Sequence, residues 1–252
     1  MDENSKDIAR LFLELTKYKN QKGDSAMSRG EKPPPPEYSH PESKAVISLP
    51  KPDLSLLDKE KFSGIIQSRR SRRTYASSPL PLVELSLLLF ATQGVQEKGD
   101  FYHLKTVPSA GARHPLETYM AINRVDGLDS GLYHYLPFSH GLELLRKDEE
   151  TGKELRRACL DQDMFTGSAV NFIWSSVFYR TEWKYKERGL RYVYLDAGHV
   201  CQNLYLACEA LGLACCAVAA FDDDACNRFL GIDGKEQFCL YMATVGGRRQ
   251  TP

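Results

Sequence analysis

The chain has 252 residues, and its 33 basic side chains are balanced by 33 acidic ones, which does not suit a non-specific nucleic-acid binder. A hydrophobic content of 42% and a charged content of 26% are those of an ordinary globular protein, long enough to fold as one large domain or two small ones without disulfides. Seven cysteines without a Cys-x-x-Cys spacing favour reduced, buried thiols and give a zinc site little support.

The first residues and the apolar stretches indicate the cellular location. Met-Asp-Glu-Asn has neither the basic nor the apolar region of a secretory signal. The longest apolar stretch, residues 213–221, is far too short to span a bilayer. We therefore expect a cytoplasmic protein with no membrane or nucleic-acid partner.

Residues 1–56 are expected to form an N-terminal helix and a proline-rich arm ahead of a main domain over residues 57–252. Ser5 can cap an amphipathic helix over residues 5–18, which carries apolar residues at helical spacing: Ile8, Leu11, Phe12 and Leu15. A helix of this length must dock on something to be stable. Residues 19–53 then form a linker, stiffened by a tetraproline at 33–36.

An arginine cluster follows a short helix predicted over residues 57–68. Four arginines fall within five positions, 69–73, interrupted only by Ser71. Guanidinium groups stay charged and present forked donors, so several together can bind a phosphate dianion. A solvated basic face is the commoner explanation for such a run taken alone.

A stretch of small residues, Pro108–Gly111, comes next. It follows an apolar helix that begins at Pro81 and stops near Gly94, and then a predicted loop over residues 95–107. Small residues let a backbone approach a flat ligand closely, and Gly111 permits a positive φ. A plain turn explains this tetrapeptide equally well by itself.

The second half of the chain mixes strand and helix patterns and therefore predicts an α+β fold. Alternation predicts a strand from residue 116 to 123 and a hairpin after it. The remaining expected elements are a hairpin over 131–136 and 141–145, a helix at 149–160, a strand at 169–178, mostly helix over 181–212, a strand at 213–220, a short helix from 221 and a last strand at 238–245.

The stretch from Leu195 to Leu211 is apolar on nearly every face, which is typical of a helix in the centre of a domain or at a subunit interface. Its polar residues Asp196, His199 and Asn203 share one face. A metal site is disfavoured because a third ligand at suitable spacing is missing. A hydrogen-bonded stripe at an interface explains them better.

Several motifs occur in the order found in a known family. Arg69-Arg70-Ser71-x-Arg73 resembles the FMN-phosphate motif of nitroreductase-fold flavoproteins. The segment from Pro108 to Glu117 is similar to that fold's second flavin-contacting segment, in the form used by SagB-type dehydrogenases. The pattern continues through Trp183-Lys184-Tyr185, Arg188-Gly189-x-Arg191-Tyr192, Leu195-Asp196-Ala197-Gly198-His199 and Gly212-Leu213, with a weaker echo at Leu15-Thr16-Lys17-Tyr18.

The resemblance implies a nitroreductase-like fold, with a central mixed sheet flanked by helices, assembled as a homodimer with FMN in each interface. It implies three groups of cofactor-binding residues: Arg69, Arg70, Ser71 and Arg73 with Arg248 and Arg249 at the phosphate, Pro108, Ser109, Ala110, Gly111 and Arg113 against the ring or ribityl chain from the partner subunit, and Ala219 and Ala220 at the reactive ring edge. It assigns proton transfer to the catalytic pair Lys184 and Tyr185. No metal is implied.

The expected function is an FMN-dependent oxidoreductase of the SagB-type class, acting on a small-molecule or peptide substrate, such as an azoline-like ring that loses two electrons. A nitro- or quinone reductase that uses NAD(P)H is one alternative. A non-catalytic scaffold subunit that binds flavin or peptide is another. Bound flavin that a physiological donor reduces would argue against the scaffold.

Overall fold

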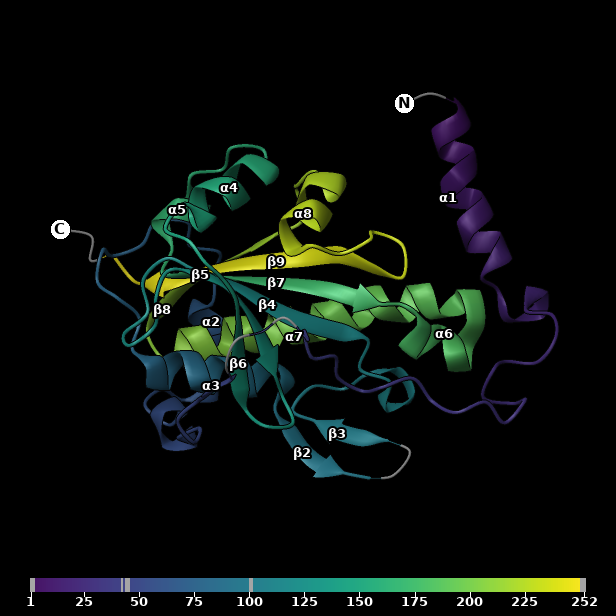
Figure 1. Cartoon of the computed structure of the whole chain (residues 1–252), viewed down its shortest axis with the longest axis horizontal. Helices are drawn as coiled ribbons and strands as arrows, with labels where there is room; N and C mark the ends of the chain where they lie inside the picture. Colours follow the sequence, from purple (N-terminus) through teal and green to yellow (C-terminus); the bar gives the residue numbers. More distant parts are fainter. Residues whose placement is uncertain (1–2, 42, 44–45, 100–101, 250–252) are drawn as a thin grey trace.

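The computed structural model of this chain describes residues 3–41, 43, 46–99 and 102–249. Its centre is a seven-stranded sheet with the strand order β1-β6-β5-β4-β7-β9-β8 (Figure 1). The strands are β1 (Val46–Ser48), β4 (Leu116–Ile122), β5 (Gly131–Leu136), β6 (Gly141–Lys147), β7 (Val170–Val177), β8 (Leu213–Val218) and β9 (Gln237–Gly247).

All ladders of this sheet are antiparallel in the described part of the chain. The α+β class is confirmed, but the expectation of a mixed sheet is wrong. The helical connection from β7 to β8 does produce two strands that run in the same direction. However, β9 lies between them and pairs antiparallel with both, so the two parallel strands are not neighbours.

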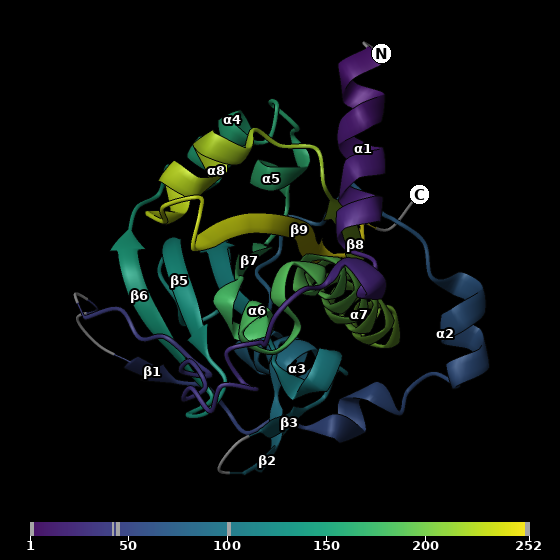
Figure 2. The same cartoon turned by 90° about the vertical axis from the view of Figure 1, so that its right-hand side faces the viewer.

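Helices cover both faces of the sheet (Figure 2). On one face α3 (Leu82–Gln93) and α7 (Gly189–Ala210) close the larger apolar core, with α2 (Phe62–Ser68) outside them. On the other face α4 (Thr151–Ala158), α5 (Met164–Gly167) and α8 (Asp223–Leu230) close a second core. None of these described helices is long and apolar enough to cross a membrane.

Two predicted segments differ in detail from the structure. Residues 95–107, expected as a loop, contain a separate hairpin of β2 (Val95–Lys98) and β3 (His103–Lys105), whose strands are too short to show a clear period. The expected helical region 181–212 is divided into α6 (Tyr179–Tyr185), a 3-10 turn (η4, Lys186–Arg188) and α7. The division falls at Lys186, whose φ of 55° ends α6.

The N-terminal segment runs along the outside of this body. Helix α1 (Glu3–Leu15) projects away from it, and η1 (Tyr18–Asn20) follows. The chain between α1 and β1 then passes α6, where Trp183 Nε1 donates to Glu31 O and Arg180 Nε donates to Pro35 O. A second 3-10 turn, η2 (Leu54–Leu57), leads into α2.

Candidate functional site

The arginine cluster lies beside the edge strand β8 and the end of β9. After α2, the chain runs along β8 and β9: Arg72 N donates to Cys215 O at 2.9 Å, and Ala76 N donates to Gly247 O at 2.9 Å. Tyr75 pairs with Arg248 in an isolated antiparallel bridge. The fold therefore brings the first cluster and the basic residues after the last strand into one region.

The charges in this region divide into two sets. Arg72 and Arg248 bind the buried carboxylate of Glu209, with N–O distances of 2.6 and 2.7 Å. Burial opposes ionisation of Glu209, but hydrogen bonds from Ser68, Arg72 and Arg248 outweigh it and lower its pKa. Within the described residues, the remaining predicted phosphate ligands have no carboxylate within 4.0 Å: Arg69, Arg70, Arg73 and Arg249. Their guanidinium groups suit an external anion.

Tyr205 on α7, which was not among the predicted site residues, connects this cluster to the sheet. Its hydroxyl lies 2.8 Å from Ser71 Oγ and accepts a hydrogen bond from Ala217 N at 2.7 Å. Arg69 lies over its ring, 5.2 Å from the centroid. In sequence, Tyr205 is one more apolar-looking position of a long buried helix, so nothing distinguished it there.

The predicted segment Pro108–Gly111 packs against the predicted catalytic pair in the same chain. Gly111 has a φ of +58°, and a Cβ added there would lie 2.5 Å from Tyr185 Oη and 2.8 Å from Lys184 Nζ. The lysine Nζ also lies over the ring of Tyr185, 5.4 Å from its centroid. The positive φ and the closeness of these two side-chain ends both favour glycine at this position.

Asp196 on α7 fixes this turn. Its buried carboxylate accepts hydrogen bonds from Ser109 Oγ at 2.6 Å and from Ala110 N at 3.2 Å. Burial raises the pKa of Asp196, against the opposing effect of those two hydrogen bonds. The polar stripe expected on this helix is thus partly internal: Asn203 also bonds within the chain, to Ala91 O, while His199 is exposed.

A cation–π contact of Arg113 completes this group. Arg113 lies over the ring of Trp183, 4.9 Å from its centroid, on the helix that carries Lys184 and Tyr185. Burial raises the pKa of the Tyr185 phenol, and the nearby Tyr18 raises it further. The predicted residues Pro108–Gly111, Arg113, Lys184 and Tyr185 therefore form one cluster.

Ala219 lines a cavity of about 470 Å³ between α7, the end of β8 and β9. The α7 residues that line it are Tyr194, Ala197 and Gly198. Ala220 is exposed beside it, and its carbonyl accepts a hydrogen bond from Gln162 Nε2 at 2.8 Å. Small residues on two sides leave room for a flat ligand.

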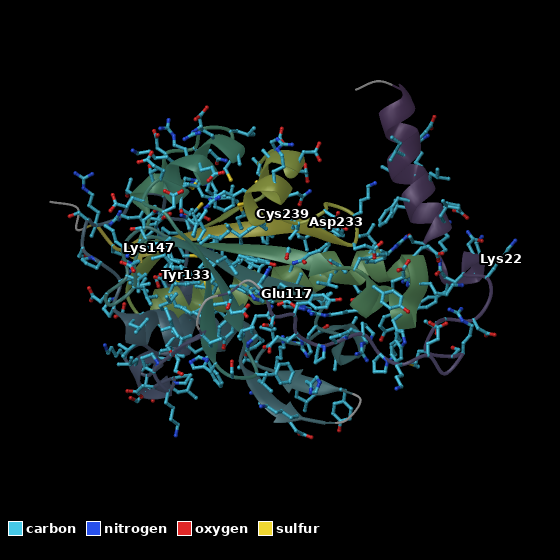
Figure 3. The ribbon with its side chains drawn as sticks, in the orientation of Figure 1. Lys22, Glu117, Tyr133, Lys147, Asp233 and Cys239 are labelled. Atoms are coloured by element: carbon cyan, nitrogen blue, oxygen red, sulfur yellow. The ribbon has the colours of Figure 1, made fainter. Side chains whose placement is uncertain are left out.

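The sheet contains a buried charged network that was not predicted from the sequence. His134 on β5 lies between Glu117 (2.9 Å) and Glu143 (3.1 Å), and Arg180 also pairs with Glu117. Figure 3 shows Glu117 in the middle of the molecule. Burial disfavours each charge, but the hydrogen bonds and opposite charges outweigh it, so the pKa of His134 rises to about 9 and those of both glutamates fall to about 2.

This network holds the N-terminal arm rather than a metal ion. Potential ligand atoms of His40, His134 and Glu143 lie within 4.8 Å of one another. However, both ring nitrogens of His134 donate to carboxylates, which leaves none for a metal. The carboxylates also bind the arm directly, through Tyr38 N to Glu117 and through Ser39 Oγ and His40 N to Glu143.

Comparison with known proteins relates this chain to one family. The model of the nitroreductase family matches residues 66–247. A protein of Methanocaldococcus jannaschii that is named as a nitroreductase is 40% identical over 75% of this chain and 92% of its own length. The trifolitoxin-processing protein TfxB of Rhizobium leguminosarum is 32% identical over 68% of this chain, and the microcin B17-processing protein McbC of Escherichia coli is 24% identical over 55%. The matches span only 49% and 53% of those two processing proteins.

Solved structures show the same fold. A nitroreductase structure from Anabaena variabilis has a TM-score of 0.64 at 29% identity. The match covers 75% of this chain and 38% of that one. The E. coli microcin synthetase complex with a truncated pro-peptide bound contains a chain with a TM-score of 0.61 at 18% identity, covering 99% of this chain and 95% of that one. A nitroreductase of Desulfovibrio desulfuricans, solved in complex with FMN, has a TM-score of 0.52 at 16% identity over 77% of this chain and 92% of its own.

Proposed function

The chain belongs to the nitroreductase family, and from this premise we propose that it is an FMN-dependent oxidoreductase of the SagB-type dehydrogenase class. The observation that carries the proposal is that two faces of α7 contact two different groups of predicted site residues. Tyr205 and Asp196 are about two and a half helical turns apart and therefore lie on opposite faces of this helix. One face meets the arginine cluster, and the other meets the turn before the Lys184–Tyr185 pair.

On the first face, the residues present fit the two ends of a flavin nucleotide. Arg69, Arg70 and Arg73 supply charged donors without a carboxylate partner among the described residues, and Ser71 adds a hydroxyl. The cavity beside Ala219 opens on the same face, because Gly198 and Tyr205 are about two turns apart. The arginines would hold the phosphate, and the cavity would receive the ring system.

The second face supports assembly as a homodimer. Pro108–Gly111 and the Lys184–Tyr185 pair point away from their own chain's arginine cluster, across the thickness of α7. A second copy would allow them to meet the cofactor held by the other chain. Between the two faces, Leu195, His199 and Gln202 form an exposed stripe on α7, with Leu195 60% exposed, which is a suitable contact for that copy.

Bound FMN would supply the two-electron redox chemistry. The protein would bind and orient it and would handle the proton. Lys184 Nζ and Tyr185 Oη lie together against Gly111, and the half-buried pair can hold or accept a proton there. Asp196 positions the turn that carries Gly111. Oxidation of an azoline ring in a peptide removes a hydride from one ring carbon, which bound FMN would accept, and a proton from a neighbouring ring position, which this pair could accept.

The similarity to the M. jannaschii protein favours a second candidate, an NAD(P)H-dependent nitro- or quinone reductase. The two candidates differ in direction: a reductase accepts electrons from NAD(P)H, whereas a dehydrogenase takes them from its substrate. The absorption spectrum of the purified protein, recorded before and after anaerobic NAD(P)H addition, separates them. We expect about one FMN per chain and slow bleaching by NAD(P)H compared with bleaching by a thiazoline peptide.

A colourless protein that does not take up FMN on reconstitution would refute the proposal. Rapid bleaching by NAD(P)H, followed by reoxidation with a quinone or nitroaromatic, would favour the reductase. Light scattering tests the assembly: we expect a dimer, and we expect Leu195→Glu to weaken it. A flavin-loaded monomer would refute the homodimer.

A further inference from the structure

Helix α1 has an apolar stripe that its own chain leaves uncovered. Ile8 is 70% exposed, Leu11 56% and Leu15 55%, and these positions share one face of the helix. Figure 1 shows α1 projecting away from the body at one end of the molecule. An isolated helix of 13 residues is marginal in water, so this stripe needs a partner.

An apolar groove of about 570 Å³ lies near the other end of α7. Its walls include residues from η2, α2 and the C-terminal half of α7: Leu54, Leu57, Phe62, Ile65, Leu206 and Ala207. Phe62 is 67% exposed, and the neighbouring Ile66 is 53% exposed. Figures 1 and 2 show α1 directed away from α2, so the helix does not fill this groove in its own chain.

The anchor of α1 and the groove lie on the same face of α7, at opposite ends. At the N-terminal end, Arg188 Nη1 donates to Thr16 O at 2.6 Å, and Tyr192 Oη lies 2.7 Å from Tyr18 Oη. Residues 188, 192, 195, 199, 203 and 206 follow the i, i+4, i+7 pattern of a single helical face. The exposed stripe of α7 therefore joins the anchor of α1 to the wall of the groove.

A two-fold contact along this stripe places the N-terminal end of one α7 beside the C-terminal end of the other. The 22 residues of α7 extend about 33 Å, and α1 extends about 20 Å. We propose that α1 of each copy docks its Ile8–Leu11–Leu15 stripe into the groove of a second copy of this chain. This inference rests on the homodimer of the proposed function, and it identifies the segment that is exchanged.

The exchange makes the second copy part of the cofactor site. Helix α2 ends at Ser68, immediately before Arg69, and Ile65 is its one buried residue among those described. The packing of this helix within its own chain therefore adds little to the position of Arg69, the first residue of the cluster. The second copy's α1 covers Phe62 and Ile66 and thereby holds Arg69 to Arg73 in place for the phosphate.

Cross-linking between two single-cysteine-substituted chains tests the contact. Chains carrying Leu11→Cys and chains carrying Phe62→Cys are co-expressed with different tags and treated with a short bismaleimide. The seven native cysteines are buried, so their background is low. We expect a cross-linked species of twice 28.5 kDa that carries both tags. Leu13→Cys is the matched control, because Leu13 is equally exposed (53%) but lies on the opposite side of α1.

A second experiment reads out the cofactor. Leu11→Glu should weaken FMN binding roughly ten-fold while the dimer persists through α7, because the substitution places a charge in the groove that the leucine would fill. Leu13→Glu should bind FMN as the unmodified protein does. A dimer without the Leu11–Phe62 cross-link, or equal cross-linking through Leu13, would overturn the exchange and leave the dimer intact. A flavin-loaded monomer would instead overturn the dimer itself.

Discussion

Replacing Gly111 by alanine tests whether the Lys184–Tyr185 pair handles protons. The new Cβ would lie 2.5 Å from Tyr185 Oη and 2.8 Å from Lys184 Nζ. Non-bonded heavy atoms normally stay about 3.5–4.0 Å apart, so both side-chain ends must withdraw by roughly 1 Å. Both are ends of flexible chains, so the fold can absorb this shift, but the positions of the two polar atoms change.

The backbone cost of the same substitution can be measured separately. Gly111 has a φ of +58°, and Gly127 has a φ of +78° with no atom within 4 Å of an added Cβ. Alanine in this conformation costs about 1–2 kcal/mol, partly offset by about 0.4–1 kcal/mol from the stiffer unfolded chain. Gly127→Ala should therefore lower the free energy of unfolding by up to roughly 1.5 kcal/mol and leave turnover normal.

Turnover should distinguish the two variants more sharply than stability does. A misplacement of about 1 Å costs on the order of 10²-fold in rate, so kcat of Gly111→Ala should fall about that far below kcat of Gly127→Ala. FMN content, the midpoint of thermal unfolding and kcat are measured on both, with whichever substrate first supports turnover. If Gly111→Ala keeps the kcat and the pH–rate profile of Gly127→Ala, the position of the Lys184–Tyr185 pair does not matter to the reaction.

Three further predictions concern the cofactor, the reaction and the fold. Replacing Arg69 and Arg73 together by alanine should weaken FMN binding by roughly 10²-fold or more in a fluorescence titration, with activity partly restored by excess FMN; unchanged affinity would refute the phosphate assignment. Lys184→Ala and Tyr185→Phe should retain FMN but lose about 10²–10⁴-fold in turnover, and excess FMN should not restore it. The pKa of His134 is raised from 6.5 to about 9, so its protonated form stabilises the fold. This contribution to the free energy of unfolding, on the order of 3 kcal/mol, is complete below pH 6.5 and is lost progressively as the pH rises through 9. His134→Gln should therefore remove that alkaline loss from the pH dependence of unfolding; an unchanged pH dependence would show that the histidine is not charged in the folded protein.

Long periodic segments were predicted well because one repeat dominated each of them. The strand expected at 169–178 is β7 over Val170–Val177, and the apolar helix ending near Gly94 is α3 over Leu82–Gln93. The β2–β3 hairpin was missed because strands of three or four residues hold too few repeats of the pattern. The prediction of a mixed sheet was wrong for a different reason. Whether two parallel strands become neighbours depends on which strand lies between them, and β9, the last strand of the chain, lies between β7 and β8.

Buried charges were missed because alternation normally separates a core face from a solvated one. Glu117 and Tyr119 alternate with Leu116 and Thr118, which indicates a polar outer side for β4. Helices cover both faces of the sheet, so every residue of β4 is buried. The buried charges pair with residues of other strands and of the N-terminal arm. These partners are too far apart in the sequence for a local pattern to predict the pairing.

The candidate site shows the same limit at larger scale. The sequence contains the arginines, the glycine turn and the Lys-Tyr pair, and their order along the chain resembles one family. It did not indicate that Glu209 engages Arg72 and Arg248, or that Arg69 has no carboxylate partner among the residues that the structure describes. Nor did it indicate that Tyr205 contacts Ser71 in the arginine cluster while Asp196, on the opposite face of α7, holds the turn beside Lys184 and Tyr185. Because one chain holds these two groups on opposite sides of α7, the proposed cofactor site needs residues from a second chain. The proposed exchange of α1 would bring the two chains together at each cofactor.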